Sequence, residues 1–204
     1  MLGKTHVLGG TAAALGGFIV LQDKGLLYSG FPAYQSLAIM LPYAIWSSTL
    51  ADFDQENKDM AARSPINAFF QKFFKLIGAG HRSFKSHVLP VLIMAVLTLG
   101  IYLGFIKSSG GVVSSINLLI LTGMTFGYSS HMILDMFTSG QVEIWPEHKF
   151  GFVPRESMFN AGSPYEDIVR RVLYVATVFL LLFIAWRGVQ NTPAVIAIIA
   201  NFNK

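Results

Sequence analysis

A histidine and an aspartate four residues apart, His131 and Asp135, lie in an otherwise apolar stretch of the chain. A spacing of four places both side chains on one face of a helix. An ionisable residue among apolar neighbours is costly in a bilayer and is functional by default, although Asp135 can also serve only to orient or charge-pair His131. The pair predicts a site in which imidazole and carboxylate act together.

Further histidines and aspartates lie at the ends of the neighbouring apolar stretches, namely His6, Asp52, Asp54, His81 and His87. Alone, each has an ordinary explanation as a solvated or capping residue, but in an up-and-down helical bundle all these ends meet at one face. The chain has no cysteine, so a metal here would need imidazole and carboxylate ligands, a set that binds divalent ions. The candidates outnumber the three protein ligands of a simple catalytic zinc site. We therefore expect one or two ions, zinc first and manganese or another divalent metal as the alternative.

The composition places these residues in a membrane protein. Only 13% of the 204 residues are charged and the mean hydropathy is +0.53, whereas soluble domains usually carry about 25% charged residues. Apolar stretches near the length of a bilayer span cover about residues 5–21, 31–50, 88–106, 112–137 and 172–186. The sequence thus predicts an all-α integral membrane protein, with a single membrane-embedded domain over 1–204 built as a bundle of about five transmembrane helices.

Two apolar segments have a second interpretation. The first stretch follows Lys4 and is short enough for a cleaved signal peptide, but its glycine-rich, weakly hydrophobic composition favours a span. The apolar tail at 192–202 is short for a span, so the sequence leaves open whether it enters the membrane.

The lysines and arginines indicate the orientation of the bundle. With five spans, the N-terminus and the connections at 51–87 and 138–171 face the same side, and they hold most of the basic residues. The other side holds Lys24, Lys107, Arg187 and Lys204. The bias towards basic cytoplasmic loops places the histidines and aspartates at the cytoplasmic face. The net charge of +4 is modest and lies beside apolar runs, so we expect membrane lipid as the partner and no nucleic acid.

The connection at 51–87 contains a second pattern. Apolar side chains at 66, 69, 70, 73, 74 and 77 share one helical face, with Lys72 and Lys75 off it. The pattern predicts an amphipathic helix at about 65–77. Such a helix suits either the cytoplasmic membrane interface or the end of the bundle, and the sequence favours neither.

The order of these motifs resembles the YdjM-like family of bacterial inner-membrane proteins, described as membrane-bound metal-dependent hydrolases. That family has an N-terminal His, an LPDxD-type motif, an HRxxTHS-type motif and a GxxxHxxxD segment followed by Thr, Gly and Trp-Pro. The matching residues here are His6, Leu50-Ala51-Asp52-Phe53-Asp54, His81-Arg82-Ser83-Phe84-Lys85-Ser86-His87, Gly127 to Asp135, Thr138, Gly140 and Trp145-Pro146.

Two departures from the family pattern concern site residues. Ala51 replaces the usual proline, and the histidines of the third motif, His81 and His87, are one residue further apart than usual. The longer spacing makes His87 the weaker of the two candidates. The family is also distantly similar to the helical zinc phospholipase C and P1 nuclease group, which supports phosphoester hydrolysis by analogy alone.

The resemblance implies a metal-dependent hydrolase of the bacterial inner membrane, with a phospholipid or lipid-linked phosphate as the expected substrate. The expected metal ligands are His6, Asp52, Asp54, His81, His131 and Asp135, and the expected catalytic residues are Asp54, Arg82 and His87. Arg82 can bind a phosphate bidentately or simply face anionic lipid. The alternatives are a divalent-metal transporter, which usually binds its ion nearer the bilayer midplane, and a non-catalytic, metal-stabilised membrane protein.

Overall fold

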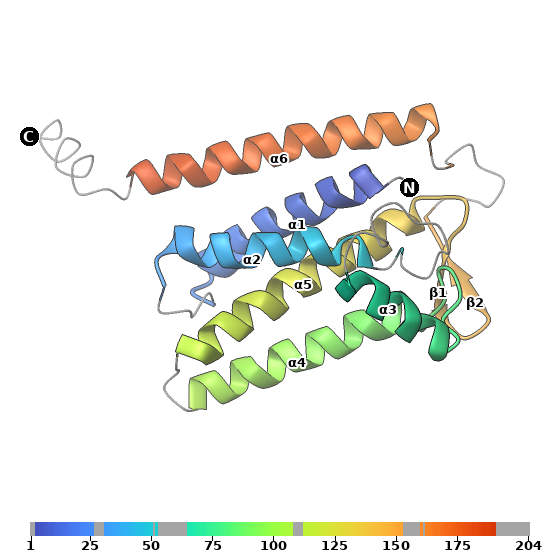
Figure 1. Ribbon diagram of the computed structural model, residues 1–204. Coiled ribbons are helices and arrows are strands. Elements are labelled where there is room, and N and C mark those ends of the chain that lie inside the picture. The colour runs from blue at the N-terminus through green and yellow to red at the C-terminus, as the bar shows by residue number, and fades with distance from the viewer. Residues whose placement is uncertain are drawn as a thin grey trace, which may run out of the picture.

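The computed structural model describes residues 3–26, 31–50, 52, 65–107, 112–152, 160 and 162–190. Within this part of the chain it is mostly helical, with six helices and one small hairpin (Figure 1). The elements, in chain order, are α1 (Gly3–Asp23), α2 (Ala33–Ser47), α3 (Pro65–Leu76), α4 (Val88–Lys107), α5 (Val112–Met136), β1 (Val142–Trp145), β2 (His148–Phe150) and α6 (Pro164–Gln190).

The long helix α5 is the centre of the bundle. It packs against α1, α2 and α4, whereas α6 packs against α1 (Figure 1). Two glycines one turn apart, Gly123 and Gly127, allow the close approach of α2, because a Cβ at these positions would overlap the backbone oxygens of Met40 and Ala44. Small residues at this spacing let helices approach closely in lipid. The Ser47 hydroxyl then donates to the Met124 carbonyl at 2.9 Å.

Helix α6 lies at the edge of the bundle and is joined to α1 at both ends. The Thr5 hydroxyl donates to Glu166 Oε1 at 2.6 Å, and Arg187 pairs with Asp23 at the other end. The sequence predicted a span from 172, where the charges end, but the helix begins at Pro164. The start is favourable because proline suits the first helical turn and the Ser163 hydroxyl accepts from the Glu166 N–H at 3.4 Å.

The connection at 138–171 differs from the all-α prediction, which was wrong here. Val142–Trp145 and His148–Phe150 pair as an antiparallel hairpin with an irregular register between Glu143 and Trp145. The turn places Glu147 at a φ of 70°, and the Glu143 carboxylate accepts from the Glu147 N–H at 2.8 Å. The long apolar runs that identified the spans carry no signal for so short a hairpin.

Helix α3 divides its apolar residues between the bundle and the surface. Phe74 is buried against Leu50, Met94 and Tyr128, with Phe70 packed beside them, so the helix does dock on the end of the bundle. Three other large apolar side chains of the helix, Phe69, Phe73 and Leu76, are exposed. The packed interpretation of this helix therefore holds for one part of its apolar face.

Among the described residues, two helices are long and apolar enough to cross a membrane, Gly3–Asp23 and Pro164–Gly188, and Val88–Gly104 is a shorter apolar helix. Helix α2 has 15 residues, and α5 carries polar residues in its last turns. The predicted number of five spans therefore stays a prediction.

We predict that Gly127→Ala destabilises the protein, because its Cβ would overlap the Ala44 carbonyl oxygen and force α2 away from α5. The expected cost is about 1–3 kcal/mol, measured as a lower midpoint of thermal unfolding in detergent. The matched control is Gly100→Ala on α4, where a Cβ meets nothing within 4 Å. Equal midpoints for the two variants would contradict the proposed close packing.

Candidate metal centre

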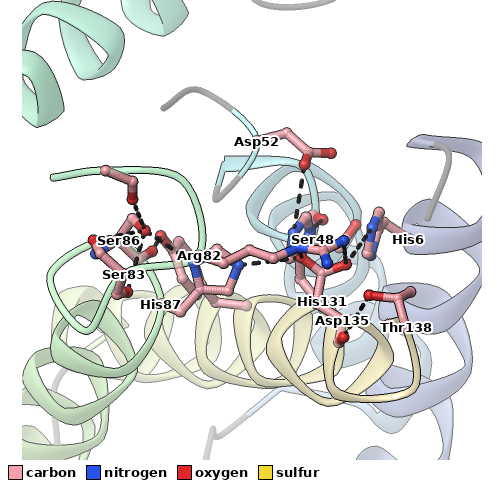
Figure 2. A network of polar contacts seen from close by, with 12 residues as sticks. His6, Ser48, Asp52, Arg82, Ser83, Ser86, His87, His131, Asp135 and Thr138 are labelled. Atoms are coloured by element: carbon pink, nitrogen blue, oxygen red, sulfur yellow. Dashed lines mark hydrogen bonds and ion pairs between the residues drawn. The ribbon is translucent and has the colours of Figure 1, made fainter. Parts of the chain in front are cut away.

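Four ionisable side chains gather inside one end of the bundle (Figure 2). His6 lies in the first turns of α1, His87 directly precedes α4, and His131 and Asp135 lie near the end of α5. The three histidines are fully buried and Asp135 is 1% exposed. The structure thus brings together four predicted site residues from three separate parts of the chain.

The carboxylate of Asp135 is the point on which the imidazoles converge. Its Oδ1 lies 3.4 Å from His6 Nε2, and its Oδ2 lies 3.3 Å from His87 Nε2 and 3.5 Å from His131 Nε2. Zinc bonds of about 2.0–2.1 Å in tetrahedral geometry place neighbouring ligand atoms about 3.4 Å apart. The separations therefore suit a bound divalent ion.

The outer ring nitrogens of two histidines are held by fixed acceptors. His131 Nδ1 lies 2.6 Å from the Ser48 carbonyl oxygen, which can only accept, so a neutral His131 carries its proton on Nδ1. His87 Nδ1 lies 3.0 Å from Ser86 Oγ, whose hydroxyl donates to the Gly80 carbonyl at 2.9 Å. In His131 this arrangement leaves the Nε2 lone pair facing Asp135, as partners of metal-binding histidines usually do, whereas His87 Nε2 lies within hydrogen-bond distance of Asp135 Oδ2, at 3.3 Å.

Three buried nitrogens lack a hydrogen bond within the described part of the chain: Nδ1 and Nε2 of His6 and Nε2 of His131. The two rings stack with centroids 3.7 Å apart. An unsatisfied buried polar group costs about 1–3 kcal/mol and needs a physical explanation. His6, His131 and Asp135 each offer a ligand atom within 4.8 Å of the others, so this group could hold a metal ion.

Arg82 holds the opposite side of Asp135. Its Nε and Nη2 donate to the two carboxylate oxygens at 3.0 and 3.2 Å, and its side chain is 12% exposed. The guanidinium lies so close to Gly140 that a Cβ there would overlap it. From the sequence we expected Arg82 to bind a phosphate or to face anionic lipid, and we did not predict its contact with Asp135.

The remaining predicted residues lie differently. Asp52 is at the margin of the cluster, with Oδ1 3.7 Å from His131 Nε2 and a side chain 29% exposed. His81 is exposed and does not belong to the group of ligand atoms found among the described residues. Asp54 lies outside the described residues.

His87 is buried in the cluster and His81 is exposed, whereas the motif spacing made His87 the weaker candidate. Before α4 the chain forms a turn in which the backbone N–H groups of Ser86 and His87 both donate to the Ser83 carbonyl. His87 consequently enters the buried cluster. A family pattern gives spacing along the chain but not the turn that converts it into position.

Three further residues that support the cluster were missed. Ser48 contributes a backbone carbonyl, Ser86 contributes its hydroxyl, and the Tyr128 hydroxyl donates to the Ser86 carbonyl. A backbone acceptor leaves no sequence signal. Ser86 lies within a recognisable motif, so only its position beside His87 could have identified it.

We predict that His131→Ala and His6→Ala each lose bound metal, since each removes one imidazole of the buried group. Metal content is measured by mass spectrometry on the full chain purified in detergent after exposure to zinc or manganese. His148→Ala is the control, because this histidine is exposed on the hairpin. His81→Ala should also retain metal. If this variant loses its metal, the buried group is not the whole site.

Comparison with known proteins adds the family. The chain matches the YdjM inner membrane protein family over residues 1–194. No curated protein and no solved structure matches it. Since the match covers nearly all of the 204 residues, the chain belongs to the YdjM inner membrane protein family.

Proposed function

We propose that this protein is a metal-dependent hydrolase of the inner membrane, acting on a phosphoester such as a phospholipid or a lipid-linked phosphate. One observation above all supports a bound metal. His6 and His131 are fully buried, and the Nε2 atom of each faces the Asp135 carboxylate but makes no hydrogen bond among the described residues. Zinc suits this set of nitrogen and oxygen ligands, with manganese as the alternative.

The position of the site supports chemistry at the membrane surface. We propose that α1, α2, α4, α5 and α6 cross the bilayer with the cluster at the cytoplasmic end. The exposed Phe69, Phe73 and Leu76 of α3 lie beside Lys72 and Lys75, a combination that suits an anionic lipid surface. Because α3 packs on the same end of the bundle (Figure 1), it would hold lipid headgroups near the site.

The residues of the cluster would have different roles in the proposed reaction. A bound divalent ion would polarise a phosphoryl oxygen and lower the pKa of water to about 7. His6, His131 and Asp135 would hold it, while His87 would fix the Asp135 carboxylate from the side. Asp52, partly exposed at the margin, is placed to accept a proton or to add an oxygen ligand. Asp54 stays a predicted catalytic residue.

A second candidate is a non-catalytic, metal-stabilised membrane protein. The observation that favours it is burial, since all three imidazoles are fully enclosed and a structural site needs no open coordination position. Asp52 and Arg82 are more exposed than the imidazoles, which favours the proposed hydrolase. A transporter is less well supported, because the cluster lies at the end of the helices.

We predict that the purified protein hydrolyses a model phosphodiester or short-chain phosphatidic acid only when zinc or manganese is added. Asp135→Asn should reduce the rate to background, because it removes a charge from the proposed ligand set. The measurement is phosphate or chromophore release in mixed micelles, with His148→Ala as the control variant. Metal that raises the unfolding temperature without any turnover on either substrate class would instead favour the stabilising role.

A further inference from the structure

The carboxylate of Asp135 already forms an ion pair with the guanidinium of Arg82. Arg82 donates to both oxygens at 3.0 and 3.2 Å, and the same oxygens lie 3.3 to 3.5 Å from three imidazole nitrogens. A bidentate arginine–carboxylate pair is one of the stronger polar interactions in proteins. A metal ion that binds through Asp135 must therefore share this carboxylate with a guanidinium.

The position of Arg82 is built into the fold at several points. The Glu143 N–H donates to the Arg82 carbonyl at 2.9 Å, which joins the loop before α4 to strand β1. Arg82 has a φ of 56°, a left-handed conformation that is uncommon for a residue with a side chain. Gly140 leaves room for the guanidinium, since a Cβ would overlap Nη1. The guanidinium is therefore held against Asp135 by its surroundings.

Two cations on one buried carboxylate repel each other. A divalent ion held by His6, His131 and Asp135 would lie within a few ångströms of the guanidinium, and charges at such distances interact strongly where water is excluded. Among the described residues, Asp135 and the partly exposed Asp52, whose Oδ1 lies 3.7 Å from His131 Nε2, are the carboxylates at the cluster (Figure 2). These two carboxylates carry less negative charge than a divalent ion and a guanidinium carry positive charge, so the described part of the cluster does not favour both cations at once.

We propose that Arg82 and a divalent metal compete for the Asp135 carboxylate, and that the guanidinium displaced by the metal becomes the group that binds an anionic ligand. This inference rests on the proposed metal centre. It assigns Arg82 two alternating partners, Asp135 and the phosphate of the substrate. The planar guanidinium suits both, because carboxylate and phosphate offer it the same pair of oxygen acceptors.

The Arg82 side chain is partly accessible to solvent, which this exchange requires. Figure 2 shows the Arg82 side chain reaching from the loop before α4 towards Asp135, and its 12% exposure exceeds that of the buried ligands. Rotation about its side-chain torsions would be needed to move the guanidinium away from Asp135 towards solvent. Metal loading and anion binding would then favour each other, since each removes a competitor of the other.

The test measures zinc affinity and phosphate affinity on the full chain in detergent. Zinc is titrated in competition with a chromophoric chelator, and inorganic phosphate is then titrated onto the zinc-loaded protein. For Arg82→Gln we expect zinc to bind about tenfold more tightly and phosphate to bind about tenfold more weakly. A role limited to structure would weaken both.

Two further variants separate the parts of the proposal. Gly140→Ala displaces the guanidinium from Asp135 without removing it, so zinc should bind more tightly while phosphate affinity is retained. Arg171→Gln removes the same charge from an exposed position of α6 and should change neither affinity. Thermal unfolding of each variant, with and without zinc, shows whether it is folded.

The outcomes are distinct. Weaker or unchanged zinc binding in both Arg82→Gln and Gly140→Ala overturns the competition, and unchanged phosphate binding in Arg82→Gln overturns the anion role. Opposite shifts of the two affinities in a protein that hydrolyses no phosphoester would sustain the exchange and overturn only the hydrolase. A wild-type protein that binds no zinc or manganese overturns the metal centre and the competition together.

Discussion

The buried carboxylate of Asp135 is the constraint on which this end of the protein depends. A charge removed from water costs several kcal/mol unless close partners compensate it. Here the partners come from α1, from the residue before α4, from α5 itself and from the loop carrying Arg82. The ends of these segments must therefore meet at one place. The polar cluster is thus both a candidate site and a reason for the arrangement of the helices.

Helix α5 combines the two kinds of contact that make this arrangement possible. Gly123 and Gly127 remove side chains where α2 approaches, and His131 and Asp135 follow one and two turns later towards the site. The close approach of α2 brings the Ser48 carbonyl within 2.6 Å of His131 Nδ1. Packing by small residues therefore determines which nitrogen of a neutral His131 ring carries the proton, and so links helix packing to the chemistry of the site.

The sequence predicted most of the helices because each apolar run is long and bounded by charges, and it predicted the gathering of His6, His131 and Asp135 because antiparallel helices bring their ends together. It did not predict the hairpin, whose strands are too short for a periodic signal. It ranked His81 above His87 on motif spacing, and spacing does not show the turn at Ser83, which depends on backbone hydrogen bonds. Motif spacing also could not show that Arg82 contacts Asp135. That contact joins residues far apart in the chain and depends on the space left by Gly140.

Helix α6 has no residue in the cluster, yet it bears on the position of His6. Helix α1 packs closely against its neighbours, since a Cβ at Gly10 or Gly17 would overlap Ser48 or Phe126. Two polar contacts with α6 add to this packing. Buried Glu166 accepts from Thr5, the neighbour of His6, and from the Gly162 N–H, while Arg187 pairs with Asp23 at the other end. The tie beside His6 is the buried one, where its hydrogen bonds are least weakened by water. The firmest attachment of the outer helix therefore lies where a shift of α1 would most disturb the candidate site.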